Sequence, residues 1–483
     1  MKYPVIFLLL GRLLGIICGL IILPAGVALY YHEVDVAICF AVTSGVVFIV
    51  ALFLVLFFRE ARTQSIGAKD SFLLVTLSWL LSSLLGALPF YLSGAIPTFI
   101  DAFFEATSGF TTTGATVLPN VEDLPKGILF WRSLTQWIGG MGIIVFAIAI
   151  LPQLSIGGMQ LMKNEMPGPS FEQIKPRIKQ TALSLWKIYL LFSVLAVFVF
   201  YFSGMSIFDS ICHMFTAVGT GGFSTKNGGI RAFESLWIEI VVIGFMFLGG
   251  INFILHYNWL RGNFKKMFLS TEWRLYCTML LVCFALITFN LSVQGGMEVN
   301  ESIRLSVFQV TTLASSTGYT TADYDTWPFL SKGILFLLMI VGGCAGSTSG
   351  GLKQVRLLLL FKKAKQAIIK HIFPKAIVPV KLDRRTVPEE VLNDVSSLFL
   401  IYMALFYICT LLLLTYNIDF VSATSAVVAC LSNIGPAFGI VGPSQSYAVL
   451  PDLPKLILAT CMIIGRLEIF TVLVLFFPST WRK

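Results

Sequence analysis

Four short glycine-containing stretches hold the residues whose types and spacing could do chemistry in this chain. Each lies in a weakly polar gap between two long apolar runs, and most add hydroxyl or amide side chains to the glycine. Glycine permits backbone conformations that turn carbonyl oxygens inward, and a ring of such oxygens can replace the hydration shell of a potassium-sized cation. The candidate ligands are Thr111, Thr112, Thr113, Gly114, Thr220, Gly221, Gly222, Ser316, Thr317, Gly318, Asn433, Ile434 and Gly435.

One such stretch taken alone would most simply be a loop turn. The four recur roughly every hundred residues, and a period of that kind predicts a repeated structural unit. They are also in phase with the apolar runs, which favours one shared site over four separate turns. No carboxylate lies at the glycines, which argues against a ring of acidic ligands for a divalent cation.

A short apolar segment precedes each stretch, and each is too short to cross a bilayer. We expect four re-entrant half-helices whose carbonyl ends, which carry partial negative charge, point toward the stretches and favour a cation there. Asp101 and Asp209 suit the first turns of two of them, where anionic side chains are favoured. The segments are Phe99–Thr107, Ile207–Ala217, Ile303–Leu313 and Val421–Leu431.

The composition places these segments in a lipid bilayer. Of the 483 residues, 57% are hydrophobic and only 12% are charged, whereas about a quarter of a soluble protein is charged. A membrane-crossing helix needs about 20 apolar residues, and ten runs qualify. They lie near 5–30, 36–58, 71–93, 129–152, 184–204, 235–260, 275–294, 332–361 (interrupted), 396–416 and 455–478.

The links between these runs alternate between basic and acidic. Because cytoplasmic links carry the excess of Lys and Arg, we expect both termini to be cytoplasmic and the four stretches to lie in external loops. The net charge of +9 has the same origin, so it does not indicate nucleic-acid binding. The basic links are 59–70, 153–180, 261–274 and 353–385.

The predicted fold is therefore an all-α polytopic membrane protein with one central pore. Four pseudo-repeats of span, re-entrant half-helix and span surround the pore, and two extra helices precede them. The predicted divisions are 1–64 for the extra pair, then 65–160, 161–262, 263–370 and 371–483 for the four repeats.

The eighth span is interrupted by five glycines within ten residues. They cannot hold a regular helix, since each costs about 1 kcal/mol relative to alanine. Irregular backbone at membrane depth must line a cavity or be covered by protein, so a flexible gate or a passive kink is expected. A phosphate loop is excluded because Leu352 separates Gly351 from Lys353. The candidate gate residues are Gly342, Gly343, Gly346, Ser347, Thr348, Ser349, Gly350 and Gly351.

Arg466 lies inside the last apolar run, with Glu468 two residues on. An intramembrane arginine faces a cavity or a partner as a rule, and positions i and i+2 do not share a helix face. We therefore expect the two not to pair, and Arg466 to be a gate residue, a snorkelling arginine or half of an interhelical salt bridge. Trp131, Arg132 and Trp137 suit an aromatic belt with a snorkelling arginine.

Several segments carry a family resemblance. The chain resembles the Trk/Ktr/HKT superfamily of potassium transporters, and within it the bacterial TrkH branch. The fourth stretch departs most from the sequence pattern of potassium channels, which predicts looser selectivity. The matching segments are TSGFTTTGATV (107–117), FTAVGTGGFST (215–225), SSTGYTTADYDTWP (315–328), LSNIGPAFG (431–439), WRSLTQWIGGMGIIVFAIAILPQL (131–154), GGCAGSTSGGLK (342–353) and GRLEIF (465–470).

This resemblance implies potassium uptake across the bacterial inner membrane through the four stretches. It implies that Arg466 lies in the pore near the glycine loop, where it repels cations at rest and bonds to loop carbonyls. It also implies a homodimer and a peripheral cytoplasmic subunit of TrkA type with nucleotide-binding domains. The basic 353–385 link suits such a partner or anionic lipid heads. The chain itself is expected to bind potassium as cargo, and no nucleotide.

Two other functions stay open at this point. A carrier that couples potassium to protons or sodium, for example a symporter, would need a titratable residue at mid-depth. Only Glu468 and His213 are candidates. A membrane enzyme would need a catalytic cluster such as paired carboxylates, and the sequence offers none, so we do not expect an enzyme.

Overall fold

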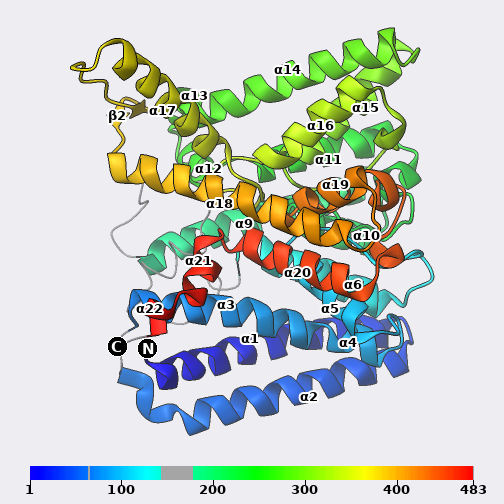
Figure 1. Ribbon diagram of the computed structural model, residues 1–483. Coiled ribbons are helices and arrows are strands. Elements are labelled where there is room, and N and C mark those ends of the chain that lie inside the picture. The colour runs from blue at the N-terminus through cyan, green and yellow to red at the C-terminus, as the bar shows by residue number, and fades with distance from the viewer. Residues whose placement is uncertain (64–65, 143–177, 482–483) are drawn as a thin grey trace.

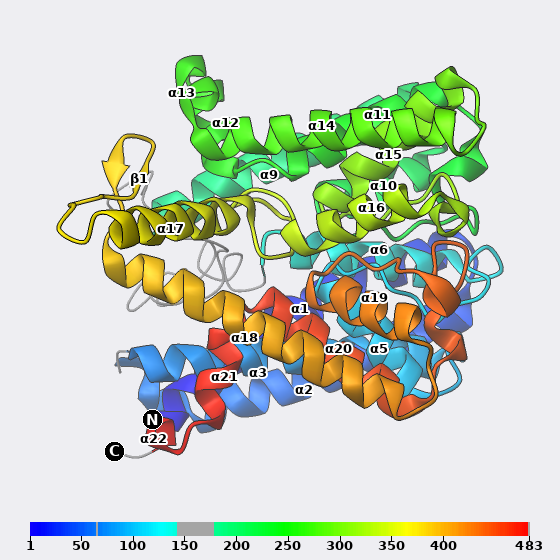
Figure 2. The same ribbon diagram turned by 45° about the horizontal axis from the view of Figure 1, so that its top comes forward.

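The computed structural model describes residues 1–63, 66–142 and 178–481 as a bundle of long helices running in one general direction (Figures 1 and 2). In the described part, six helices are long and apolar enough to cross a membrane. The only strands there form a small hairpin, so the predicted all-α fold class is confirmed. The six spans are α1 (Tyr3–Tyr30), α2 (Val34–Phe57), α3 (Ala68–Gly86) continued by α4 (Leu88–Leu92), α9 (Ile178–Phe202), α14 (Thr271–Val293) and α18 (Glu389–Leu414).

The four predicted half-helices are present and lie in the half of the bundle remote from both termini (Figure 1). Asp101 and Asp209 are in first turns, as expected. The capping residues are Thr98 and Ser206. The hydroxyl of each accepts from the backbone N–H of the aspartate, Asp101 or Asp209, and donates to the carboxylate of the same aspartate. These bonds satisfy N–H groups that a helix start leaves free. The half-helices are α5 (Phe99–Phe110), α10 (Ile207–Val218), α15 (Val299–Ala314) and α19 (Phe420–Leu431).

The second helix of every repeat ends at a glycine or directly beside one. The predicted spans 235–260 and 455–478 are each broken by a bend that the sequence did not indicate, of 100° in the first and 108° in the second. The expected interruption of 332–361 is present, whereas only the beginning of 129–152 lies within the described residues. The helices are α6 (Lys126–Gly140), α11 (Leu236–Gly249) followed by α12 (Phe253–Leu260), α16 (Phe329–Val341), and α20 (Asp452–Arg466) followed by α21 (Phe470–Leu473).

The basic 353–385 link is largely structured. It consists mostly of α17 (Gln354–Ile372) and the hairpin of β1 (Lys381–Leu382) and β2 (Arg385–Thr386). The first turns of α17 pack against α18 in a small apolar cluster apart from the main core. The basic 153–180 link lies almost wholly outside the described residues. The remaining helices are α13 (Phe264–Leu269), α22 (Pro478–Trp481), and the 3-10 turns η1 (Arg59–Thr63), η3 (Gly229–Phe233), η4 (Tyr324–Thr326), η5 (Gly439–Val441), η6 (Tyr447–Val449) and η7 (Val474–Phe476).

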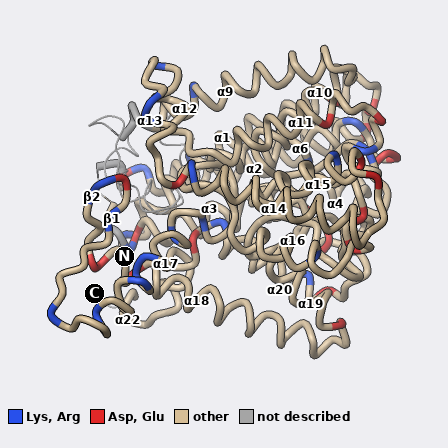
Figure 3. The backbone as a smooth tube through the Cα atoms, turned by 90° about the horizontal axis from the view of Figure 1, so that it is seen from above, with Lys and Arg blue, Asp and Glu red and all other residues tan. Residues whose placement is uncertain are grey.

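Charge separates along the bundle. Lys and Arg are concentrated at the end that holds both termini, α13 and the β1–β2 hairpin, and Asp and Glu are more frequent at the other end (Figure 3). This separation matches the alternation of basic and acidic links in the sequence.

The extra pair, α1 and α2, packs on the first repeat (Figure 1). Between them, Glu33 accepts from the backbone N–H of Lys126 at 2.6 Å and of Gly127 at 2.9 Å. A carboxylate is favoured there because these are free N–H groups at the positive end of α6. The pair itself is close-packed at Gly11, where an added Cβ would lie 2.8 Å from the Cβ of Leu54.

We predict that Gly11→Leu destabilises the α1–α2 pair by about 1–3 kcal/mol, since overfilling a packed contact has that cost. The measurement is the thermal unfolding midpoint of the purified protein, which should fall. Gly15→Leu is the matched control, because Gly15 lies one turn further along α1 with open space around it. Equal midpoints for the two variants would contradict the close packing.

Candidate cation site

The four stretches share one backbone conformation. In each, the glycine and the residue two positions before it have positive φ, a region that non-glycine residues seldom adopt. The repetition at four quasi-equivalent places shows that the stretches are structural copies, although their sequences differ. The pairs are Thr112 (53°) with Gly114 (84°), Thr220 (52°) with Gly222 (78°), Ser316 (55°) with Gly318 (82°), and Asn433 (52°) with Gly435 (96°).

The four glycines meet in a closed ring. A Cβ added to any of them would lie within 3.0 Å of the carbonyl oxygen of the residue before the glycine in the next repeat. The fourth repeat closes this series on the first. Only glycine therefore fits, and the four stretches surround one axis. The successive contacts are Gly114 with Gly221, Gly222 with Thr317, Gly318 with Ile434, and Gly435 with Thr113.

A cavity of about 270 Å³ opens on one side of the ring. Gly114, Gly222 and Gly318 line it together with Pro436, which follows the fourth glycine. Its walls are the segments after the stretches, so it is a vestibule shared by all four repeats.

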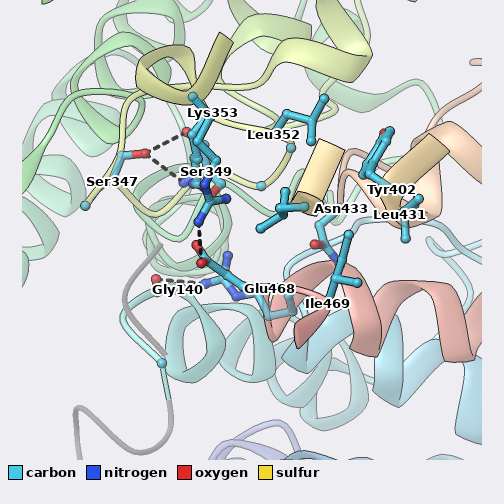
Figure 4. A pocket seen from close by; sticks show the side chains of 18 of the residues that line it. Gly140, Ser347, Ser349, Leu352, Lys353, Tyr402, Leu431, Asn433, Glu468 and Ile469 are labelled. Carbon is cyan, nitrogen blue, oxygen red and sulfur yellow. Dashed lines mark hydrogen bonds and ion pairs between the residues drawn. The ribbon is translucent and has the colours of Figure 1, made fainter. Parts of the chain in front are cut away.

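A smaller cavity of about 60 Å³ lies on the other side, beneath the fourth stretch (Figure 4). Asn433 lines it from the stretch, and Ser349 and Lys353 line it from the glycine-rich segment. Arg466 and Glu468 complete the wall from the end of α20. The structure thus brings the predicted gate loop and Arg466 together directly below the ring.

The glycine loop is packed tightly against other repeats. Its residue Thr348 donates from its hydroxyl to the carbonyls of Val218 and Gly249, both at 3.2 Å. A Cβ on Gly350 would collide with the backbone of Ser432, at the start of the fourth stretch. The loop therefore fills the space under the ring, as a closed gate would.

Glu272 of α14 ties the loop to the first turn of α17. Its Oε1 accepts from the backbone N–H of Ala345 at 2.6 Å and of Val355 at 3.3 Å. The sequence analysis did not single out this residue. The sequence signal that could have identified Glu272 is its position as an acidic residue at the start of an apolar span.

Arg466 bridges the loop and the first repeat. Its guanidinium donates to the carbonyl of Thr348 at 2.9 Å and to the carbonyls of Gly139 and Gly140 at 2.6 and 2.9 Å. The latter two carbonyls lie at the negative end of α6, which favours a cation. Arg466 and Glu468 do not pair with each other, as expected, because Glu468 forms its ion pair with Arg356.

Arg132 is not a snorkelling residue, and that prediction was wrong. Its side chain is 4% exposed and pairs with the buried Glu105 of α5 at 2.6 Å. It also donates to the carbonyl of Ser224 at 3.0 Å, while Glu105 accepts from the backbone N–H of Val117 at 2.9 Å. The pair therefore joins the segments that follow the first and second stretches. Trp131 is likewise buried rather than part of a belt.

Gln136 of α6 supports the second stretch in the same way. Its Nε2 donates to the carbonyl of Gly221 at 2.7 Å, and its Oε1 accepts from Phe223 at 3.1 Å. His213 is a buried, hydrogen-bonded residue in contact with the carbonyl of Asp209 and the hydroxyl of Ser224. Sequence reasoning missed Gln136 and Glu105 because a polar residue within an apolar helix does not reveal which backbone it faces.

Re-entrant helices that converge on a ring of backbone oxygens, inside a bundle of membrane-crossing helices, are the architecture of a membrane protein that transports cations. The family model described as "TrkH: Cation transport protein" matches residues 39–483. The chain belongs to this family, which is one of transporters.

The relatives cover the whole chain. Two proteins named Trk system potassium uptake protein TrkH, from Salmonella typhimurium and Escherichia coli K12, are 38% identical over 100% of both chains. The crystal structure of the potassium transporter TrkH from Vibrio parahaemolyticus superposes with a TM-score of 0.89 at 33% identity, covering 100% of both chains. The chain is thus a multi-pass membrane protein of the TrkH type.

We predict that Gly318→Ser lowers the preference for potassium over sodium about tenfold, or ~1.4 kcal/mol. The new Cβ would collide with the Ile434 carbonyl and displace the ring. Competition by sodium against rubidium uptake in liposomes measures the change. Gly333→Ser in α16, where the surrounding space is open, is the control. An unaltered preference at normal expression would rule out selection by this ring.

We also predict that Arg132→Met lowers the free energy of unfolding by about 3–5 kcal/mol, because it leaves the buried Glu105 charge unpaired. The double variant Arg132→Met/Glu105→Gln should recover part of the loss. Thermal unfolding measures both. Lys370→Met is the control, since its partner Glu389 is 75% exposed and such pairs contribute little. A double variant no better than the single one would contradict the pairing.

Proposed function

We propose that this chain mediates potassium uptake across the bacterial inner membrane through the ring of four stretches. The closed contact of the four glycines is the observation that carries the proposal. It supports a filter in which backbone carbonyls of all four repeats coordinate the ion. The relatives named as potassium uptake proteins support potassium as the cargo.

The ion path follows from the order of the cavities. Potassium enters the 270 Å³ vestibule from outside, loses water at the ring, and arrives at the glycine loop, whose residues line the smaller cavity. The half-helices present their negative ends to the ring, which lowers the energy of a cation there. The concentration of Lys and Arg at the end with both termini (Figure 3) supports a cytoplasmic location for that end.

Control lies below the ring. The loop 342–351 fills the path, and Arg466 adds a positive charge that repels an arriving cation. Removing the loop from the path would require breaking its bonds to Arg466 and to the ends of α10 and α11.

A cytoplasmic regulator of TrkA type with nucleotide-binding domains is the partner we propose, acting on a homodimer of this chain. The support is the basic surface of α17 and the hairpin, which an acidic partner would complement. Its exposed cations are Lys365, Lys370, Lys375, Lys381, Arg384 and Arg385.

A carrier that couples potassium to protons or sodium is the second candidate. Neither mid-depth candidate is free, since Glu468 pairs with Arg356 and His213 has two hydrogen-bond partners. Rubidium uptake into liposomes, with and without a pH or sodium gradient, separates the two functions. Uptake that follows the potassium gradient alone supports the uncoupled pore, and uptake driven by another gradient supports the carrier.

We predict that Arg466→Ala raises basal rubidium flux about tenfold, which corresponds to a barrier lower by ~1.4 kcal/mol. The variant removes the cation, its hydrogen bond to the loop at Thr348 and its two hydrogen bonds to the end of α6. Deleting part of 345–350 should act in the same direction. The control is Arg261→Ala, because Arg261 is exposed and stacks on Tyr257. Equal or lower flux at normal expression would refute the gate.

A further inference from the structure

The bend that follows α20 sets the position of Arg466. Glu468 and Ile469 have φ of 58° and 51°, and the chain turns by 108° between α20 and α21. Two successive side-chain-bearing residues in the left-handed region cost free energy and persist only when their surroundings hold them. Some contact must therefore stabilise this bend.

One side-chain contact at this bend is the ion pair between Glu468 and Arg356. Their side chains are 16% and 9% exposed, and the Arg356 guanidinium donates to Glu468 Oε2. The other carboxylate oxygen, Oε1, is buried and accepts no hydrogen bond in the part of the chain that the structure describes. Among these residues, Arg356 is thus the one hydrogen-bonded partner of a buried charge, a situation in which losing the partner has a large effect.

Arg356 lies in the first turn of α17, directly after the glycine loop. In the same turn, the backbone N–H of Val355 donates to Glu272, which also holds the start of the loop. Further along, α17 carries Lys365 and Lys370, two of the exposed cations of the basic surface. One rigid helix therefore connects the cytoplasmic surface, the end of the loop and the bend that carries Arg466.

We propose that Arg356 is a positioning residue of the gate. Through Glu468, it fixes the bend that keeps Arg466 under the ring. A displacement of α17 would break this ion pair, release the bend and withdraw Arg466 together with the loop. This inference rests on the proposed potassium pore and adds the link by which a cytoplasmic partner of acidic surface would act on it.

The test compares basal rubidium flux of the full-length protein in liposomes without any partner. Arg356→Gln and Glu468→Gln should each raise flux about fivefold or more, the range of typical coupling between sites. The double Gln variant should raise it no further, and the charge swap Arg356→Glu/Glu468→Arg should restore low flux. Arg261→Gln, which removes an exposed arginine that stacks on Tyr257, is the control and should leave flux unchanged.

A second comparison separates positioning from general stability. In an Arg466→Ala background, Glu468→Gln should add nothing, because the residue through which it acts is gone. If Arg356→Gln proves unstable, Arg356→Lys is the alternative variant. It keeps the charge, so its rubidium flux should be close to that of the wild type. Additive effects, or a swap that does not restore low flux, would overturn the proposal. Absence of rubidium flux in both the wild type and Arg466→Ala would instead overturn the potassium pore itself.

Discussion

The structure depends on backbone meeting backbone at four points around one axis. No side chain separates the stretches there, so every atom beyond glycine's hydrogen would push two repeats apart. The half-helices aim at this ring, the capping bonds fix their starts, and buried polar side chains hold the segments on either side. Arg132, Glu105 and Gln136 serve this purpose, since each bonds to backbone next to a stretch. Buried polar groups with partners specify one arrangement, which an apolar core alone would not.

Much of the fold was readable from the sequence because a bilayer imposes simple lengths and periods. The half-helices and the broken eighth span followed from runs too short or too rich in glycine to cross. The bends after α11 and α20 could not be predicted in this way, because the sequence stays apolar through Gly250 and on both sides of Arg466. The shared signal was the endings Gly139-Gly140, Gly249-Gly250, Gly342-Gly343 and Gly465-Arg466, which a comparison of the repeats with one another would have shown.

The site was partly predictable for the same reason. Glycine at a repeated position indicates a constraint on the backbone, so the ring residues could be found from the sequence. A charged residue in an apolar segment indicates only that it has a partner, and does not show which residue that partner is. Arg132 was assigned to the membrane surface, but its partner Glu105 lies in the adjacent half-helix and makes it a core residue. Glu272 and Arg356 depend on where distant helices cross, which no local pattern records.

The end of the second helix differs in one repeat, and such a difference is possible only because the four repeats belong to a single chain. Three repeats place a second glycine where the fourth places Arg466. In a tetramer of identical subunits, any residue at this position would occur four times around the axis. Four guanidinium groups so close together would repel one another strongly in a weakly polar site, and they would exclude cations permanently. Fusing four repeats into one polypeptide allows a single positive charge at this position, as the proposed gate requires.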